Sequence, residues 1–174
     1  MTLRKETDEC ILRVIEDKKW VTSREVAEIC KVSQSTAQLH LKYLEERGIV
    51  KSYRIGNVVF YRSAQCSDCD VPPLLQTVVN LLVEYLEKLT NNSKGKVVTF
   101  SSSRFFRWIG ADTCRKILGL AFPKFAMIIN ELFKRVKDMC PECFYDFNIS
   151  KGRTRIVMYS DKVRKIIELL RNVV

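Results

Sequence analysis

The stretch TSREVAEICKVSQSTAQLHLKYLEERGIVKSYRIGNVVFYR, residues 22–62, holds two helix starts followed by a hairpin. The first helix start is Thr22, because Glu25 three positions later completes the pattern of a capping box. This pattern predicts a helix over residues 23–30. The residues that this helix offers to a core are Val26, Ala27 and Ile29.

A second helix start lies at Ser33, where a serine hydroxyl suits the N-cap position. The predicted helix covers residues 34–47 and ends before Gly48, because glycine is favoured just after a helix C-terminus. Its apolar residues at i, i+4 and i+7 are Ala37, Leu41 and Leu44. We expect this stripe to be buried and the opposite face of the helix to meet solvent.

Two runs of alternating residues follow, over residues 49–54 and 58–62. Between them Gly56-Asn57 supplies the residues of a tight turn, so the runs predict a β-hairpin. Upstream, residues 8–18 predict another helix from the helical spacing of their apolar residues. Those residues are Ile11, Val14 and Ile15.

The order helix, helix, turn, helix, hairpin resembles the winged helix-turn-helix of MarR/ArsR-type DNA-binding regulators. The resemblance covers residues 8–63, and it implies a winged helix-turn-helix domain over residues 1–63. The residues that carry it are Thr22 with Glu25, Ala27, Val32-Ser33, Thr36-Ala37, Leu41, Leu44 and Gly48-Ile49-Val50. The fold class that we expect for the chain is α+β and mostly helical.

The resemblance assigns the helix after Ser33 to the major groove of double-stranded DNA. Its outward residues would contact base edges, because Gln pairs bidentately with adenine and hydroxyl groups bond to bases or phosphate. These residues are Gln34, Ser35, Thr36, Gln38 and Lys42. On the hairpin, Arg54, Asn57 and Arg62 would reach backbone phosphates.

One position departs from the pattern of such helices. Where they commonly carry a basic residue, this helix has Leu39, with the single histidine, His40, beside it. The departure lowers the expected number of phosphate contacts and favours a protein partner for part of this face.

After Pro72-Pro73, the sequence predicts a long helix with two adjacent apolar seams over residues 74–89. Two seams make a face wider than one intramolecular contact needs, so we predict a homodimer through this helix. The alternative is an internal helix buried between two domains. The predicted segments are thus residues 1–63, residues 64–93 with the long helix, and residues 94–174, with the polar stretch 91–96 as the linker.

Residues 94–174 predict a strand, several helices (one of them over residues 113–122), a hairpin and a closing helix. This order of elements also suits a second winged helix. The hairpin tip carries Lys151, Arg153 and Arg155 around a glycine, and we expect these residues to contact DNA.

The net charge of the chain is +10, and it is unevenly placed. Residues 94–174 hold 17 Lys and Arg against 7 Asp and Glu, whereas residues 63–93 have a net charge of −3. Such a basic balance favours nucleic acid as the partner. With no apolar leader and no apolar run long enough to span a bilayer, we expect a cytoplasmic, nucleoid-associated protein and no membrane partner.

Four of the seven cysteines form two Cys-x-x-Cys pairs, Cys66 with Cys69 and Cys140 with Cys143. Each such turn supplies two thiolates, so the two pairs together predict a four-cysteine zinc site that connects the two halves of the chain. The alternatives are an iron–sulfur cluster, disulfides or free thiols. The remaining cysteines lie among apolar residues, where we expect small buried hydrophobic side chains. They are Cys10, Cys30 and Cys114.

The sequence contains no pairing of nucleophile and base and no phosphate-binding glycine loop. We therefore predict that the protein is not an enzyme. The leading hypothesis is a DNA-binding protein, a dimeric transcription regulator with a structural zinc site. The alternative is an architectural or adaptor subunit of a replication or transcription complex, with the winged helix docking protein.

Overall fold

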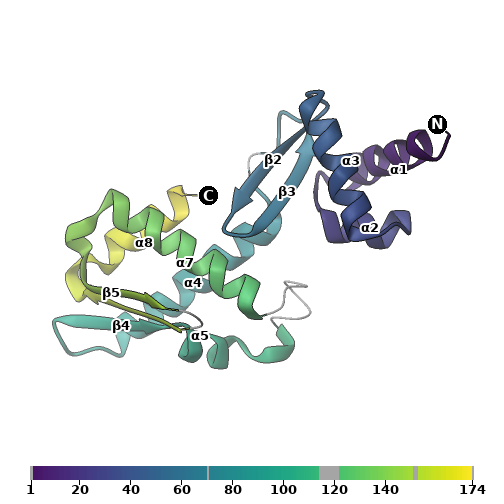
Figure 1. Cartoon of the computed structure of the whole chain (residues 1–174). Helices are drawn as coiled ribbons and strands as arrows, with labels where there is room; N and C mark the ends of the chain where they lie inside the picture. The colour runs from purple at the N-terminus through teal and green to yellow at the C-terminus, as the bar shows by residue number, and fades with distance from the viewer. Residues whose placement is uncertain (1, 70, 114–121, 151–152, 174) are drawn as a thin grey trace. The chain divides into compact units, whose positions relative to one another are not determined.

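The chain forms two compact units, Met1–Pro72 and Pro73–Val174 (Figure 1). The computed structural model describes residues 2–69, 71–113, 122–150 and 153–173. The fold class is α+β and mostly helical, as the sequence predicts, with one small antiparallel sheet in each unit. None of the helices in the described residues combines the length and the apolar character needed to cross a membrane.

The first unit follows the order of elements that the sequence predicts. Its three strands form one antiparallel sheet in the order β1-β3-β2, in which β2 and β3 are the hairpin, or wing. The elements are α1 (Thr2–Lys18), β1 (Trp20–Thr22), α2 (Ser23–Cys30), α3 (Gln34–Glu46), β2 (Val50–Ile55) and β3 (Val58–Ser63).

The core of the first unit joins the three helices to the wing. The predicted stripe of α3 is buried, as are the predicted core residues of α1, Ile11, Val14 and Ile15. The cluster consists of Ile11, Val14, Ile15, Val21, Val26, Ala37, Leu41, Leu44, Val50 and Tyr61.

Ile29 is the exception to the predicted core, because its side chain is 46% exposed. The neighbouring Cys30 is turned toward α1, where its sulfur is bonded to that of Cys10. Successive residues of a helix are about 100° apart, so Ile29 is turned away from this contact.

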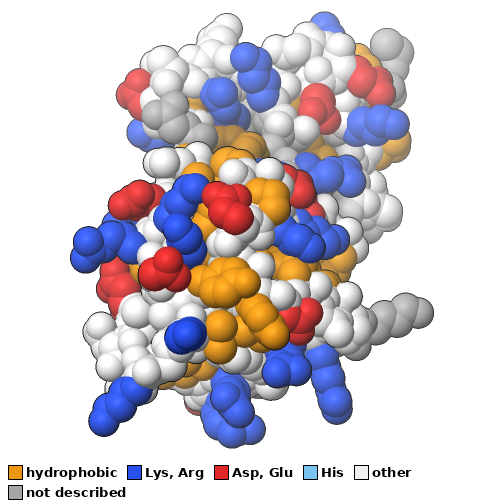
Figure 2. Space-filling model, turned by 90° about the vertical axis from the view of Figure 1, so that its left-hand side faces the viewer, with side chains coloured by type: hydrophobic (Ala, Val, Ile, Leu, Met, Phe, Trp, Pro, Cys, Tyr) orange, Lys and Arg blue, Asp and Glu red, His pale blue; other side chains and the backbone are white. Residues whose placement is uncertain are grey.

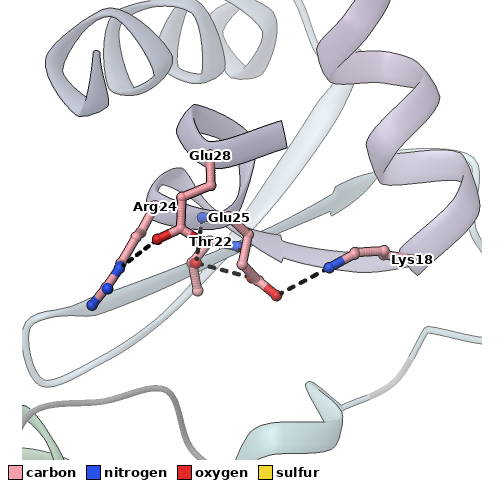
Figure 3. Close-up of polar contacts among 5 residues, drawn as sticks. All are labelled: Lys18, Thr22, Arg24, Glu25 and Glu28. Atoms are coloured by element: carbon pink, nitrogen blue, oxygen red, sulfur yellow. Dashed lines mark hydrogen bonds and ion pairs between the residues drawn. The ribbon is translucent and has the colours of Figure 1, made fainter. Parts of the chain in front are cut away.

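The start of α2 is fixed by the capping box that the sequence predicts (Figure 3). The Thr22 hydroxyl accepts a hydrogen bond from the Glu25 amide at 3.3 Å, and the Thr22 amide donates to the Glu25 carboxylate at 2.8 Å. That carboxylate also lies 3.6 Å from the Lys18 ammonium at the end of α1. The cap therefore connects the end of one helix to the start of the next.

The second unit also contains three strands, in the order β4-β6-β5. The helix expected over residues 113–122 lies largely outside the described residues. The described elements are α4 (Pro73–Asn91), β4 (Val97–Ser101), α5 (Ser102–Ile109), α7 (Phe122–Met139), η1 (Pro141–Cys143), β5 (Phe144–Ser150), β6 (Arg153–Tyr159), η2 (Ser160–Lys162) and α8 (Val163–Asn172).

The two units share a plan. In each, a helix leads into a short strand, further helices follow, and a hairpin closes the sheet with its second strand beside the first strand of the unit. The second unit adds α8 after its hairpin. The order of elements that suggested a second winged helix from sequence is therefore matched by the order of strands.

The boundary between the units lies at Pro72 and Pro73, so α4 belongs to the second unit. The sequence placed a linker at residues 91–96 instead. In the structure this stretch is tied to the second unit, because Ser160 donates hydrogen bonds to the carbonyl oxygens of Gly95 and Lys96 at 2.7 and 3.0 Å. A polar, glycine-containing composition marks a loop here, not a domain boundary.

Both apolar seams of α4 are largely buried within the chain. Tyr85 packs against the rings of Phe105 and Trp108, with ring centroids 5.1 Å away in both cases. This burial raises the pKa of the Tyr85 hydroxyl, an effect partly opposed by the nearby Arg104. The apolar face of α4 is thus largely covered by intramolecular packing, so its width alone does not require a dimer.

Replacing Thr22 with alanine should lower the free energy of unfolding of the first unit by about 1 kcal/mol, the usual cost of losing an N-cap side chain. Urea unfolding of the full chain in a Trp108→Phe background measures this, because Trp20 then reports on the first unit alone. Ser23→Ala, one position along, is the control and should have little effect. Equal losses for both variants would contradict the role of the cap.

Candidate nucleic-acid interface

The position of α3 is set by its cap, its core stripe and the turn before it. The amide of Thr36 donates to the Ser33 hydroxyl at 3.0 Å, which fixes the first turn of the helix. In the preceding turn, Lys31 adopts the left-handed conformation with φ 53°, and the Val32 amide bonds to the Ala27 carbonyl at 3.1 Å. The helix-turn-helix geometry thus follows from backbone bonds and one serine cap.

The outward face of α3 carries the side chains that the sequence proposed for base contacts. Gln34, Ser35, Gln38 and Lys42 are all exposed. Thr36 is half-buried, and its hydroxyl lies 2.7 Å from that of Ser33, so it supports the cap more than it faces solvent.

His40 has a structural partner. Its Nδ1 atom lies 2.6 Å from the Asp8 carboxylate, and this pair connects α3 to α1 across 32 positions of sequence. Leu39, beside it, is 68% exposed. A hollow of about 660 Å³ opens next to Leu39, lined by Thr7 of α1, Val32 of the turn and six residues of α3.

The wing presents two of its three predicted phosphate contacts. Arg54 on β2 and Asn57 in the turn are exposed. Arg62 is half-buried, and its guanidinium donates to the carbonyl oxygens of Ser63 and Cys66 and lies 5.6 Å from the centroid of the Trp20 ring. In this structure Arg62 therefore holds the Cys-x-x-Cys turn to the wing.

The second unit differs from the first in the helix before its hairpin. Where α3 shows a row of polar side chains to solvent, α7 is largely buried. Phe125 and Phe133 are fully buried and pack against Phe106 and Phe100, at ring distances of 5.0 and 4.8 Å. Along its described part, α7 therefore does not offer the surface that α3 offers.

On the hairpin of the second unit, the predicted DNA-contacting cations that the structure describes are exposed. Arg153 and Arg155 lie two positions apart on β6 and point to solvent, whereas Lys151 lies outside the described residues. The view in Figure 2 shows hydrophobic side chains gathered among both basic and acidic ones. Among the described residues of the second unit, the exposed large hydrophobic ones are Val97, Met139, Tyr145 and Tyr159.

Each Cys-x-x-Cys pair is closed on itself as a disulfide, with Cα atoms 5.6 Å apart for Cys66 and Cys69 and 5.5 Å apart for Cys140 and Cys143. This is one of the alternatives that the sequence left open. A metal ion needs thiolates, so the four-cysteine zinc site applies to a reduced protein and stays a prediction.

A third disulfide was not foreseen. Cys10 of α1 and Cys30 of α2 are bonded, with Cα atoms 6.0 Å apart, and both are half-buried, whereas the sequence predicted separate small hydrophobic side chains. Cys114 lies outside the described residues. The sequence gives only a weak indication of this disulfide, since the two cysteines are 20 positions apart on different helices.

The turn at Cys140 contains one further side chain that could bind a metal ion, the carboxylate of Glu142. Glu142 Oε1 lies 3.0 Å from the Cys140 sulfur and 2.9 Å from the Lys165 ammonium, and the hydrogen bond from Lys165 lowers the pKa of this carboxyl. The Glu142 carboxylate and the sulfurs of Cys140 and Cys143 lie within 4.8 Å of one another. After reduction, the turn therefore offers three ligands of the kinds that zinc binds, two thiolates and one carboxylate. The carboxylate is already paired with Lys165.

Comparisons with known proteins agree with this geometry. Residues 4–51 match a family described as winged helix-turn-helix DNA-binding, which covers α1 to the start of β2. The first unit is therefore a winged helix-turn-helix domain, and DNA-binding proteins are the class to which this domain points.

The chain as a whole resembles a solved structure, that of a hypothetical protein from Pyrobaculum spherical virus. The likeness covers 92% of this chain and 97% of the viral chain, with a TM-score of 0.53 and 17% identity. At this identity the likeness shows the fold alone. No curated protein matches the sequence.

Removing the Cys10–Cys30 disulfide by a double change to alanine should lower the free energy of unfolding of the first unit by about 3 kcal/mol, because the bond closes a loop of 20 positions. The matched control is the double alanine variant of Cys66 and Cys69, whose shorter loop predicts a loss of about 2 kcal/mol. Urea unfolding without reductant measures both. Rapid alkylation of Cys10 in native protein purified without reductant would contradict the bond.

Proposed function

We propose that the protein is a transcription regulator that binds double-stranded DNA through the first unit. The observation that carries this proposal is the outward face of α3. It presents Gln34, Ser35, Gln38 and Lys42 to solvent while its opposite face is locked in the core. Amides and hydroxyls on a helix that fits the major groove are suited to base edges.

The wing supplies the electrostatic part of the proposed interface, and the hairpin of the second unit offers further cations of its own. Arg54 on the wing and Arg153 and Arg155 on β6 are exposed cations on narrow hairpins. Such side chains contact phosphates and set the position of the protein on the duplex without reading sequence. Residues 94–174, with a net charge of +10, would strengthen association with any polyanion.

Two finer predictions from the sequence concern assembly and metal. Dimerisation through residues 74–89 rests on the sequence pattern alone, because these apolar residues are largely buried within the chain. It predicts a mass in solution of twice 20.3 kDa, and the monomer mass would contradict it. A zinc ion held by Cys66, Cys69, Cys140 and Cys143 is proposed for the reduced protein only. Metal analysis of protein purified under reducing conditions tests it, with zinc near one equivalent as the supporting result.

The second candidate function is an adaptor role in which the protein docks other proteins. The observation that favours it is the exposed hydrophobic group of the second unit, where Tyr145 is 68% exposed and its ring lies 5.9 Å from that of Tyr159. Large exposed aromatic side chains are enriched at protein interfaces.

The salt dependence of duplex binding separates the two functions. The logarithm of the binding constant of the full chain should fall linearly with the logarithm of salt concentration. Arg54→Ala should reduce the size of this slope by about 1, since it removes one phosphate-directed cation. Lys5→Ala, which removes an exposed charge from α1 outside the proposed contacts, is the control and should leave the slope unchanged. Absence of duplex binding at low salt would favour the adaptor.

A further inference from the structure

Leu39 lies in the middle of α3 with 68% of its surface exposed. A single exposed leucine is ordinary on a protein surface. This one is set among the side chains proposed to face the major groove, because Ser35, Gln38 and Lys42 are exposed on the same face at helical spacing. From Ser35 to Lys42 the helix rises by roughly 10 Å, which matches about three base pairs of duplex.

The polar side chains of this face are suited to adenine. Gln34 and Gln38 are exposed, and their side-chain amide groups have no hydrogen-bond partner among the residues that the structure describes. A glutamine amide pairs bidentately with N6 and N7 of adenine.

Guanine is read most often by arginine or lysine. Between Gln34 and Glu46, α3 carries no arginine, and its one lysine, Lys42, lies 3.9 Å from the Glu46 carboxylate. Arg47, at the C-cap, is engaged with Tyr43, because its guanidinium donates to the Tyr43 hydroxyl at 3.2 Å and lies 5.5 Å from the ring centroid. The chemistry of the face therefore favours A·T over G·C pairs.

The position of the Leu39 backbone is fixed by the two residues that follow it. His40 is held to Asp8 of α1 at 2.6 Å, and Leu41 is fully buried in the core. A backbone so anchored presents the Leu39 side chain to a partner without the cost of ordering the helix on binding. The group that an aliphatic side chain meets in the major groove of an A·T pair is the C5-methyl group of thymine.

We propose that Leu39 is a specificity-determining residue that packs against a thymine methyl group, and that α3 reads consecutive A·T pairs with Gln34 or Gln38 on adenine. This inference rests on the proposed function, since it names the target that the same helix would read. It gives Leu39, the departure from the usual basic residue, a role in recognition in place of a phosphate contact.

The test uses deoxyuridine, which pairs as thymidine does and lacks only the methyl group. Duplex sites are first selected from a random library with the full chain, and each thymine of the selected site is then replaced by deoxyuridine. We expect one or two positions at which replacement weakens binding about fourfold, the fold-change that corresponds to ~0.8 kcal/mol for one methyl group. Leu39→Ala should bind the thymine site more weakly and should no longer distinguish it from the deoxyuridine site.

Ile29→Ala is the matched control, because Ile29 is another exposed aliphatic residue of the same unit, on α2. It should keep the fourfold discrimination of the wild type. Selected sites made of G·C pairs, or deoxyuridine discrimination that survives in Leu39→Ala, would overturn the inference and leave the DNA-binding function standing. Unchanged duplex affinity in Leu39→Ala would also overturn the inference without affecting the DNA-binding function. It would point to a protein partner at this position. Absence of any duplex binding would overturn both.

Discussion

The packing of α2 against α3 around Ala37 is the contact on which the first unit depends. Ala37 and Val26 are both fully buried, and together with Leu41 they fix the rotation of α3 about its own axis. An α-helix has 3.6 residues per turn, so burial of one stripe determines which residues form the opposite face. The presentation of Gln38 and Leu39 to solvent is therefore set by the core and not by any contact that they make themselves. A larger side chain at position 37 would separate the helices and turn that face.

Local signals in the sequence were sufficient to predict the first unit. The capping box at Thr22, the serine cap at Ser33 and the turn at Gly56, whose φ is 54°, each act over a few residues, and each appears in the structure as predicted. Long-range pairings were not predictable in the same way. The Cys10–Cys30 bond and the Asp8–His40 pair join helices that are distant in sequence, and neither leaves a periodic pattern.

The second unit shows how context overrides local composition. Residues 91–96 look like a linker, yet the backbone of this stretch is bonded to Ser160. The two seams of α4 look like a dimer surface, yet their residues are largely buried within the chain. Whether a polar stretch is a linker, or an apolar face is an interface, depends on the strands and helices that surround it. The shared order of elements in the two units likewise rests on strand order. It conceals a difference, since α3 exposes a row of polar side chains, whereas the described part of α7 is packed against aromatic rings.

The disulfide between α1 and α2 also bears on how this domain can evolve. Most substitutions lower the free energy of unfolding. The number of substitutions that a helix tolerates is therefore limited by how far the stability of the whole domain exceeds the minimum needed to stay folded. A covalent bond outside α3 enlarges that margin without using any residue of the exposed face. The exposed face of α3 is thereby separated from the residues that stabilise the domain, so substitutions on this face can accumulate while the fold is retained.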